Sequence, residues 1–237
     1  MDLGLTGRVA IVGASSRGLG LASARALAAE GARVVLNGRD ADSLARAADA
    51  LGDAAVPVVG DIADPAVPQR LVDVALATWG RLDVVVGNAG GPPHARALEV
   101  TDDAARAAFE ANALASIRLA RAALPHLQAA GWGRICFITS MAVRQPLPGL
   151  ALSNLARAGL WAWAKTAAQD VAAHGVTINL ACPGPHPTDR LTEQPSGGPV
   201  GDVDDFGRVV AFLCSAPAAF VNGVALGVDG GAVAGLL

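Results

Sequence analysis

Ser140, Ser153 and Arg157 stand within one short segment, residues 138–160, at spacings that suit an active site. Thirteen residues lead from Ser140 to Ser153, and Arg157 follows four residues later, so Ser153 and Arg157 would share one face of a helix. A serine hydroxyl and a guanidinium both donate hydrogen bonds, but neither is an acid near neutral pH. The chain contains no tyrosine. The segment therefore offers polar groups for a ligand and lacks an obvious proton donor.

Two histidines lie in loops that follow strand-like segments, His94 in GGPPHA and His186 in PGPHPT. Histidine titrates near neutral pH, so either residue could act as an acid or base; the alternative is that both are solvated loop residues. Lys165 is the single lysine and follows Arg157 by two helical turns. That distance is too long for it to replace a cation at position 157, and we expect it on the surface.

The sequence GASSRGLG, residues 13–20, joins an apolar strand-like segment to a helix-like one. Glycine allows the backbone to turn tightly and to approach a pyrophosphate at a helix N-terminus, and Gly18 and Gly20 are placed best for this. A glycine pattern alone is weak, because glycines also end strands. Its position inside a βαβ unit favours dinucleotide binding.

The second strand-like segment ends in LNGRD, about 18 residues after Gly20. An acidic residue there would bind the ribose 2′-hydroxyl of NAD, but the chain has Gly38 followed by Arg39. Arg39 and Arg17 suit a 2′-phosphate through charge-assisted hydrogen bonds, so we expect NADP(H) in preference to NAD(H). The alternative is that both are ordinary surface arginines.

Short apolar runs alternate with helix-like segments along the whole chain, which predicts right-handed βαβ units and a doubly wound parallel α/β sheet of about seven strands. No internal repeat or linker divides it, so we expect one domain over residues 1–237 with a loop at 184–202. The expected strands are 8–13, 32–37, 54–60, 82–90, 134–140, 176–184 and 223–231. The expected helices are 18–30, 40–50, 65–79, 101–129, 152–173 and 203–215.

Composition narrows the class of protein. The net charge of −3 gives no reason to expect a nucleic-acid or anionic-membrane partner. No run of about 18 apolar residues is present, so we expect a cytoplasmic chain without a membrane span. The three cysteines are far apart and form no CxxC pair, and we expect reduced thiols in the core. No His or Cys spacing suits a metal.

Several motifs together make the chain resemble the short-chain dehydrogenase/reductase family over essentially its whole length, with ketoacyl-reductase-like members nearest. The motifs are the turn GLG at 18–20, GNAG at 87–90, Asn112, Ser140, CPG at 182–184 with Thr188, and VDGG at 228–231. The resemblance implies a Rossmann-type fold and a family tetrad at Asn112, Ser140, Ser153 and Arg157. It implies cofactor contacts from Gly13, Ser15, Ser16, Arg17, Gly18, Leu19, Gly20, Arg39, Asp61, Ile62, Asn88, Ala89, Gly90, Arg157, Pro183, Gly184 and Thr188.

By the same resemblance, helices 101–129 and 152–173 would build a homodimer or homotetramer. The substrate would be a small or carrier-borne molecule. The segment after Thr188 is short, which suggests an open cleft, a large or carrier-borne substrate, or no substrate at all.

The chain departs from the family pattern in its turn and in its catalytic pair. Ala14 stands where the family has glycine, so its methyl group is expected to crowd the turn. The family uses Tyr-x-x-x-Lys, with tyrosine as proton donor, where this chain has Ser153 and Arg157. Serine is too weak an acid and too short by roughly 4 Å, so the usual mechanism should fail.

Three hypotheses remain from the sequence. The chain is an NADP(H)-dependent oxidoreductase with another proton route, such as a water between Ser140 and Ser153. It is a lyase, dehydratase or isomerase that uses His94 or His186. Or it is a catalytically impaired NADP(H) sensor or partner subunit.

Overall fold

A seven-stranded, wholly parallel sheet forms the centre of the computed structural model, which describes residues 1–188 and 199–235. The strand order is β3-β2-β1-β4-β5-β6-β7, so the order reverses between β1 and β4. The strands are β1 (Val9–Val12), β2 (Arg33–Gly38), β3 (Ala55–Val59), β4 (Val84–Gly87), β5 (Gly133–Ile138), β6 (Val176–Pro183) and β7 (Ala225–Val228). The doubly wound parallel sheet predicted from the sequence is confirmed.

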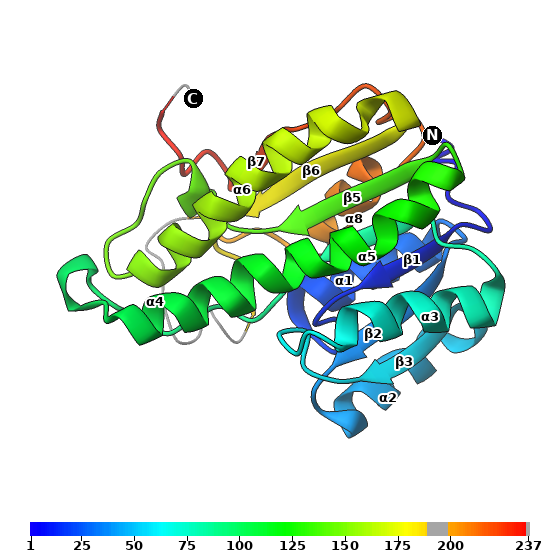
Figure 1. Cartoon of the computed structure of the whole chain (residues 1–237), viewed down its shortest axis with the longest axis horizontal. Helices are drawn as coiled ribbons and strands as arrows, with labels where there is room; N and C mark the ends of the chain where they lie inside the picture. The colour runs from blue at the N-terminus through cyan, green and yellow to red at the C-terminus, as the bar shows by residue number, and fades with distance from the viewer. Residues whose placement is uncertain (189–198, 236–237) are drawn as a thin grey trace.

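Helices cover both faces of the sheet (Figure 1). On one face lie α3 (Val67–Trp79), α5 (Ala115–Ala129) and α6 (Ala151–Val171), and on the other lie α1 (Gly18–Ala29), α2 (Ala41–Asp49) and α8 (Val203–Leu213). Both faces of the central strands are therefore buried, which explains why β1 and β4 read as unbroken apolar runs. Each layer of helices closes its own hydrophobic core.

Local sequence signals fix several helix ends. Asp40 caps α2, because its carboxylate accepts a hydrogen bond of 2.8 Å from the Ser43 amide. Asp202 caps α8 in the same way through the amides of Asp204 and Asp205. At its C-terminus α3 ends on Gly80, which has a left-handed backbone. These caps place the helix boundaries within a few residues of those expected from sequence.

The expected helix 101–129 is three segments rather than one regular helix. It begins as α4 (Asp102–Phe109), passes through a π-helical turn (Glu110–Leu114), and continues as α5. Single π turns of this kind are frequent at functional sites. Here the π turn carries Asn112, one of the predicted site residues.

The carboxyl ends of all seven strands meet at one edge of the sheet, toward α4 in Figure 1. In an open α/β sheet this edge, near the point where the strand order reverses, is where ligands bind. The predicted loop 184–202 falls here, but its residues 189–198 lie outside the described part of the chain. No helix among the described residues is long and apolar enough to span a membrane.

Candidate functional site at the carboxyl edge of the sheet

The turn between β1 and α1 depends on glycine at two positions. Gly18 opens α1 with φ of +58°, a left-handed conformation that glycine adopts without steric cost. Gly20 must be glycine because of close packing: a Cβ atom there would lie 2.5 Å from the carbonyl oxygen of Ala14 and 2.7 Å from Nδ2 of Asn88. The turn is therefore packed backbone against backbone, as a phosphate-binding turn requires.

Ala14 is strained, as its place in the turn predicts. Its φ is +44°, and it is the one non-glycine residue with positive φ in the described chain. A left-handed conformation costs an L-residue about 1–2 kcal/mol. The strain at this position lies in the backbone conformation of Ala14.

Two asparagines hold this strained turn from opposite sides. Asn88, just after β4, donates from Nδ2 to the carbonyl oxygens of Gly13 at 3.3 Å and Ala14 at 3.1 Å. Asn37, buried in β2, accepts from the Ala14 amide at 3.4 Å. Its own Nδ2 donates to the carbonyl oxygens of Val58 and Gly60, at 3.2 and 3.0 Å. The turn is thereby tied to β2, β3 and β4.

Asn37 is a residue that sequence reasoning missed. The available signal was an amide side chain inside an otherwise apolar strand, directly before the Gly38-Arg39 pair. A buried amide must find partners, and an asparagine at a strand end satisfies adjacent loops. Its role is visible only when β3 and the turn are seen on either side of it.

Ser15 has its hydroxyl group turned inward. It donates to the carbonyl oxygen of Val12 at 2.8 Å and accepts from the backbone N–H of Asn37 at 3.0 Å, and the side chain is fully buried. The hydroxyl therefore supports the turn itself. Ser16 is half-buried and lies against Gly38, whose Cβ position would be 3.2 Å from the Ser16 Cβ.

Basic side chains surround the end of β2. Arg39 is 76% exposed, and its Nη1 lies 3.9 Å from Oδ2 of Asp61. The pKa of Asp40 is held below its ordinary value, chiefly by hydrogen bonds from Ser43, and Arg17 adds to this by its charge. Arg17 and Arg39 thus both lie near the Gly38 corner.

The remaining predicted cofactor residues line the same edge. Asp61 accepts from the Ala63 amide at 3.0 Å, and Ile62 is buried beside Gly13, 3.7 Å from the position of its Cβ. Across the turn, Thr188 lies 3.5 Å from the Cβ position of Gly18. Other members are Leu19 in α1, Ala89 and Gly90 after β4, Pro183 at the end of β6, and Gly184, whose amide donates to the Val228 carbonyl at 3.0 Å.

The four predicted tetrad residues meet where β5, the π turn and α6 come together. Ser140 follows β5, and its Oγ accepts from the Ala142 amide at 3.1 Å. Ser153 is 6% exposed, in the first turn of α6. Arg157 donates from Nη1 to the Ile138 carbonyl at 3.2 Å and to the Thr139 carbonyl. Its Nη2 donates to Oδ1 of Asn112 at 3.3 Å.

Arg157 therefore braces three elements. Its guanidinium joins α6 to the end of β5 and, through Asn112, to the π turn. Asn112 is buried, and its own Nδ2 donates to the Ala108 carbonyl at 3.3 Å. A lysine has no planar fork and could not make the same set of bonds from one side chain.

The two candidate histidines have different surroundings. His94 is exposed, and its loop pairs with the start of α6 through a bridge between Ala95 and Leu150. His186 is only 6% exposed. Its Nδ1 lies 3.0 Å from the Gly184 carbonyl, and its ring packs edge-on against Phe206 at 5.2 Å. His186 is thus a packed core residue, unlike the solvated loop residue considered from the sequence.

Other sequence expectations fall away from this edge. Lys165 is exposed on α6 and lies against Gly223, before β7 begins. Cys136, Cys182 and Cys214 are buried free thiols, as expected. Within the described ranges no three His, Cys, Asp or Glu side chains gather in a way that could hold a metal ion.

A comparison with protein-family models matches residues 13–233 to the family described as enoyl-(acyl carrier protein) reductase. The chain belongs to the short-chain dehydrogenase/reductase family. This match covers the strained turn, the two asparagines and all four tetrad positions, so the family resemblance seen in the motifs is confirmed. The chain is accordingly an oxidoreductase-like member of the short-chain dehydrogenases/reductases.

Several relatives of this short-chain dehydrogenase/reductase match at full length. The 3-oxoacyl-[acyl-carrier-protein] reductase FabG of Escherichia coli is 30% identical over 236 residues, 95% of this chain and 97% of that protein. The 3-oxoacyl-[acyl-carrier-protein] reductase of Synechocystis is 32% identical over 97% of this chain and 98% of that protein. A solved structure of L-sorbose reductase from Gluconobacter frateurii, in complex with NADPH and L-sorbose, superposes with a TM-score of 0.92, covering 100% of both chains at 30% identity.

Proposed function

We propose that the chain binds NADP(H) and acts as an oxidoreductase on a carbonyl/alcohol pair, with a proton route that does not use tyrosine. The observation that carries the proposal is the turn in which a left-handed backbone at Gly18 and a close contact at Gly20 require glycine, with Arg17 and Arg39 beside it. This arrangement fits a dinucleotide with a 2′-phosphate. The NADPH complex of L-sorbose reductase, a relative with the same fold, supports it.

The residues that would hold the cofactor follow from the site. The amides at the start of α1 would meet the pyrophosphate, Arg17 and Arg39 the 2′-phosphate, and Asp61 with Ile62 the adenine side. Thr188 and the end of β6 would face the nicotinamide. NADPH, when bound, supplies a hydride.

Ser140 is the chain's own group for the substrate oxygen. Its hydroxyl is a donor as well as an acceptor, and it lies at the end of β5 beside α6. Ser153, much shorter than a tyrosine, leaves room in which a water could bridge Ser140, Ser153 and the substrate oxygen. In this proposal the water moves the proton, so turnover is slow. The substrate is a small or carrier-borne molecule.

Nucleotide preference tests the cofactor half of the proposal. We expect Arg39→Gln to weaken NADPH binding at least tenfold and to leave NADH binding unchanged, since one charge-assisted bond to the 2′-phosphate is lost. Arg96→Gln is the matched control, because Arg96 is also highly exposed and pairs with Glu99 in its own turn. Fluorescence titration measures both. An equal loss of affinity for NADPH and NADH in Arg39→Gln would contradict the assignment of Arg39 to the 2′-phosphate.

A second function, an NADP(H) sensor or partner subunit without turnover, is favoured by the bonds of Arg157. Its guanidinium bonds with the β5 carbonyls and with Asn112, and the adjacent Ser153 supplies no acid near neutral pH. NADPH consumption across a panel of ketones and acyl thioesters separates the two functions. Clear NADPH binding with no turnover at millimolar substrate would select the sensor.

The double variant Ser153→Tyr, Arg157→Lys tests whether the rest of the site is intact. It restores the family's acid and cation at the required spacing, so an otherwise complete site should gain carbonyl reduction. A variant that binds NADPH and gains no reduction with any substrate of the panel would count against the oxidoreductase proposal.

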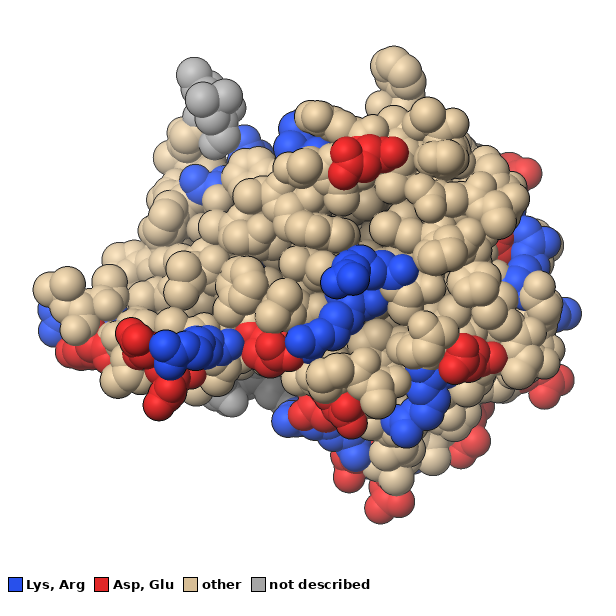
Figure 2. All heavy atoms as spheres, viewed as in Figure 1, with Lys and Arg blue, Asp and Glu red and all other residues tan. Residues whose placement is uncertain are grey.

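For assembly we propose a homodimer or homotetramer formed through α5 and α6. Figure 2 shows that the face over α6 is largely uncharged. Leu155 of α6 is 52% exposed. Light scattering of Leu155→Glu against the parent chain tests this, and an unchanged mass would contradict it. A cytoplasmic location remains a prediction from the sequence.

A further inference from the structure

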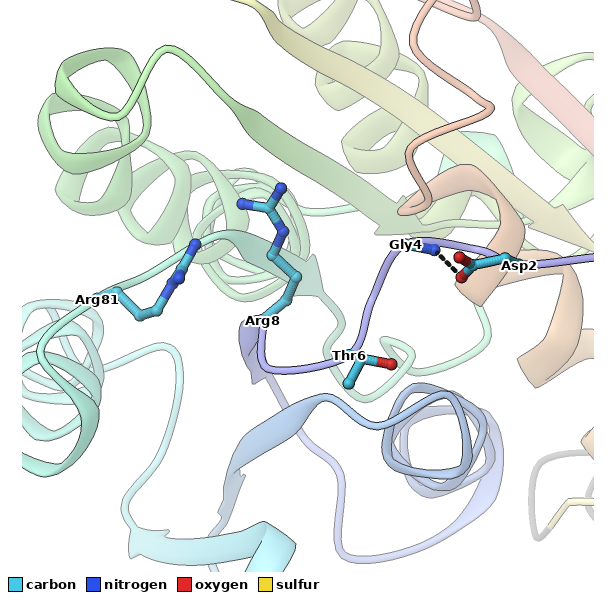
Figure 3. A pocket seen from close by; sticks show the side chains of 5 residues that line it. All are labelled: Asp2, Gly4, Thr6, Arg8 and Arg81. Atoms are coloured by element: carbon cyan, nitrogen blue, oxygen red, sulfur yellow. Dashed lines mark hydrogen bonds between the residues drawn. The ribbon is translucent and has the colours of Figure 1, made fainter.

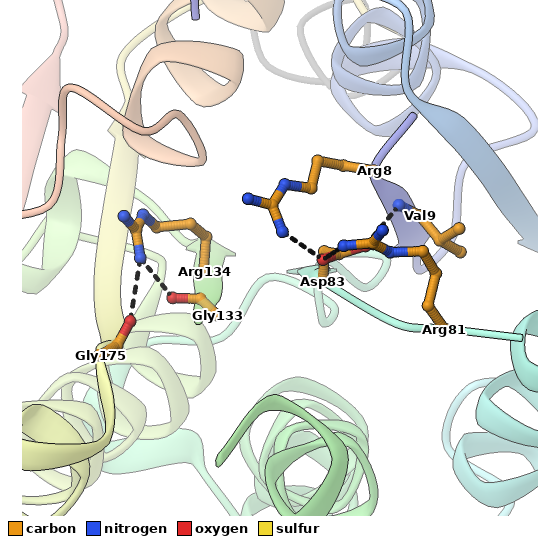
Figure 4. Close-up of polar contacts among 7 residues, drawn as sticks. All are labelled: Arg8, Val9, Arg81, Asp83, Gly133, Arg134 and Gly175. Carbon is orange, nitrogen blue, oxygen red and sulfur yellow. Dashed lines mark hydrogen bonds and ion pairs between the residues drawn. The ribbon is translucent and has the colours of Figure 1, made fainter. Parts of the chain in front are cut away.

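The opposite edge of the sheet, where the strands begin, carries a cluster of three arginines, two of which bond one buried carboxylate. Asp83 precedes β4 and is 1% exposed. Arg8 and Arg81 both donate to its Oδ1, at 2.8 and 2.7 Å, and Arg81 Nε donates to Oδ2 at 2.8 Å (Figure 4). The Val9 amide donates to Oδ2 at 2.9 Å. Asp83 is therefore fully bonded.

Arg134 joins the same cluster through an aromatic ring. The guanidinium of Arg8 lies 3.8 Å from the centroid of the Trp132 ring, and that of Arg134 lies 4.4 Å from it. Arg134 is 2% exposed and donates to the backbone carbonyls of Gly133, Gly175 and Ser215. Arg8 and Arg81 face the Asp83 carboxylate, which leaves one positive charge in excess there, and Arg134 adds another against the Trp132 ring.

An open pocket of about 360 Å³ lies beside this cluster. Arg8 and Arg81 line it together with Asp2, Gly4 and Thr6 of the N-terminal segment (Figure 3). Arg81 is 48% exposed and Arg8 25% exposed, so both guanidinium groups reach solvent. Among the described residues, the hydrogen bonds to Asp83 come from Nη1 of Arg8 and from Nε and Nη2 of Arg81, which leaves Nη2 of Arg8 and Nη1 of Arg81 as further donors. The pocket therefore presents donors that the fold leaves unused.

Asp2 adds a hydrogen-bond acceptor to the pocket. Its Oδ1 accepts from the Gly4 amide at 2.8 Å, and its other carboxylate oxygen remains as an acceptor. Guanidinium groups bind phosphate through paired charge-assisted bonds, whereas a carboxylate accepts from hydroxyl groups. A ligand with both groups would satisfy both sides of the pocket.

We propose that this pocket binds a phosphate monoester of a hydroxylated small molecule, with its phosphate on Arg8 and Arg81 and its hydroxyl groups on Asp2. The strands between this pocket and the carboxyl edge are four to eight residues long, which separates the two sites by on the order of 15 Å. The site is thus distinct from the nucleotide turn and holds whether or not the proposed function does.

The test uses the full chain carrying Arg39→Gln, so that the nucleotide corner contributes little to phosphate binding. Glucose 6-phosphate and inorganic phosphate are the probes, titrated by calorimetry. We expect Arg81→Gln to weaken both at least tenfold, and Arg96→Gln to leave both unchanged. Asp2→Asn should weaken only the preference for glucose 6-phosphate over inorganic phosphate, because the amide still accepts from Gly4. Binding of neither probe, or equal binding to the Arg81→Gln chain, would overturn the proposal.

Amide shifts keep the test decisive if Arg81→Gln does not fold. In a ¹H–¹⁵N titration of the unsubstituted chain, glucose 6-phosphate should shift the amides of Gly4, Thr6 and Val9 at the amino edge. Shifts confined to residues 13–20 and 38–40 would mean that phosphate binds only at the nucleotide turn and would overturn the proposal.

Discussion

Replacing Ala14 by glycine should stabilise the protein. Ala14 has φ of +44°, and the left-handed conformation costs an L-residue about 1–2 kcal/mol. Glycine removes that cost but has more freedom in the unfolded chain, which offsets about 0.5–1 kcal/mol. The balance is a gain of up to about 1.5 kcal/mol, which for a chain of this length raises Tm by up to about 6 °C.

The assay is thermal and urea unfolding followed by circular dichroism, without nucleotide. Ala162→Gly is the matched control, because Ala162 is exposed within the regular helix α6. The same chemical change there should destabilise by about 1 kcal/mol, since glycine is a poor helix former. A gain in the free energy of unfolding for Ala14→Gly and a loss for Ala162→Gly would support backbone strain at Ala14. A loss of stability for Ala14→Gly similar to that of Ala162→Gly would refute the reasoning.

Three further predictions follow from contacts described above. Gly20→Ala should destabilise the fold by about 1–3 kcal/mol in urea unfolding and impair NADPH binding, because the new Cβ would meet the Ala14 carbonyl. Its control is Gly90→Ala, which should not destabilise the fold, because no atom lies within 4 Å of the Gly90 Cβ position. Asp83→Asn should destabilise by about 3–5 kcal/mol in the same assay, since two arginines lose their shared carboxylate. Burial would raise the pKa of Asp83, but bonds from Arg81, the Val9 amide and Arg8 outweigh it and lower the pKa. The stability it contributes is therefore present above the unfolded pKa of about 3.9 and lost as pH falls through the folded pKa, so the parent chain should lose its advantage over Asp83→Asn in acid. The cysteines of the folded chain should resist iodoacetamide at pH 8 and react once the chain is unfolded. Burial raises the pKa of Cys182 to about 11, and a hydrogen bond with Cys214 together with burial raises the pKa of Cys136. Rapid alkylation of the folded chain would contradict this.

The fold was predictable because its strands are apolar runs that only a sheet covered on both faces can bury. Strand and helix limits came within a few residues, and the exception was the helix 101–129. Its π turn packs against α6, an element remote in sequence, so no local spacing encodes it. The π turn is held by Asn112 and Arg157, two residues 45 positions apart in the sequence.

The candidate site was predictable where backbone geometry restricts the residue type. Gly18 and Gly20 could be recognised because only glycine fits there. Asn37 could not, because its value lies in partners on β3 and the turn that are remote in sequence. His186 was not separable from His94, since only the packed structure shows Phe206 and Gly184 against its ring.

The two asparagines on either side of the turn affect how the free energy of nucleotide binding would divide into enthalpy and entropy. Asn37 and Asn88 fix the Ala14 backbone through hydrogen bonds that need no ligand. The binding loop is therefore preorganised, and little conformational entropy is lost when a dinucleotide arrives. The strain at Ala14 is borne by the fold before binding, so the free energy of the phosphate contacts contributes almost entirely to affinity.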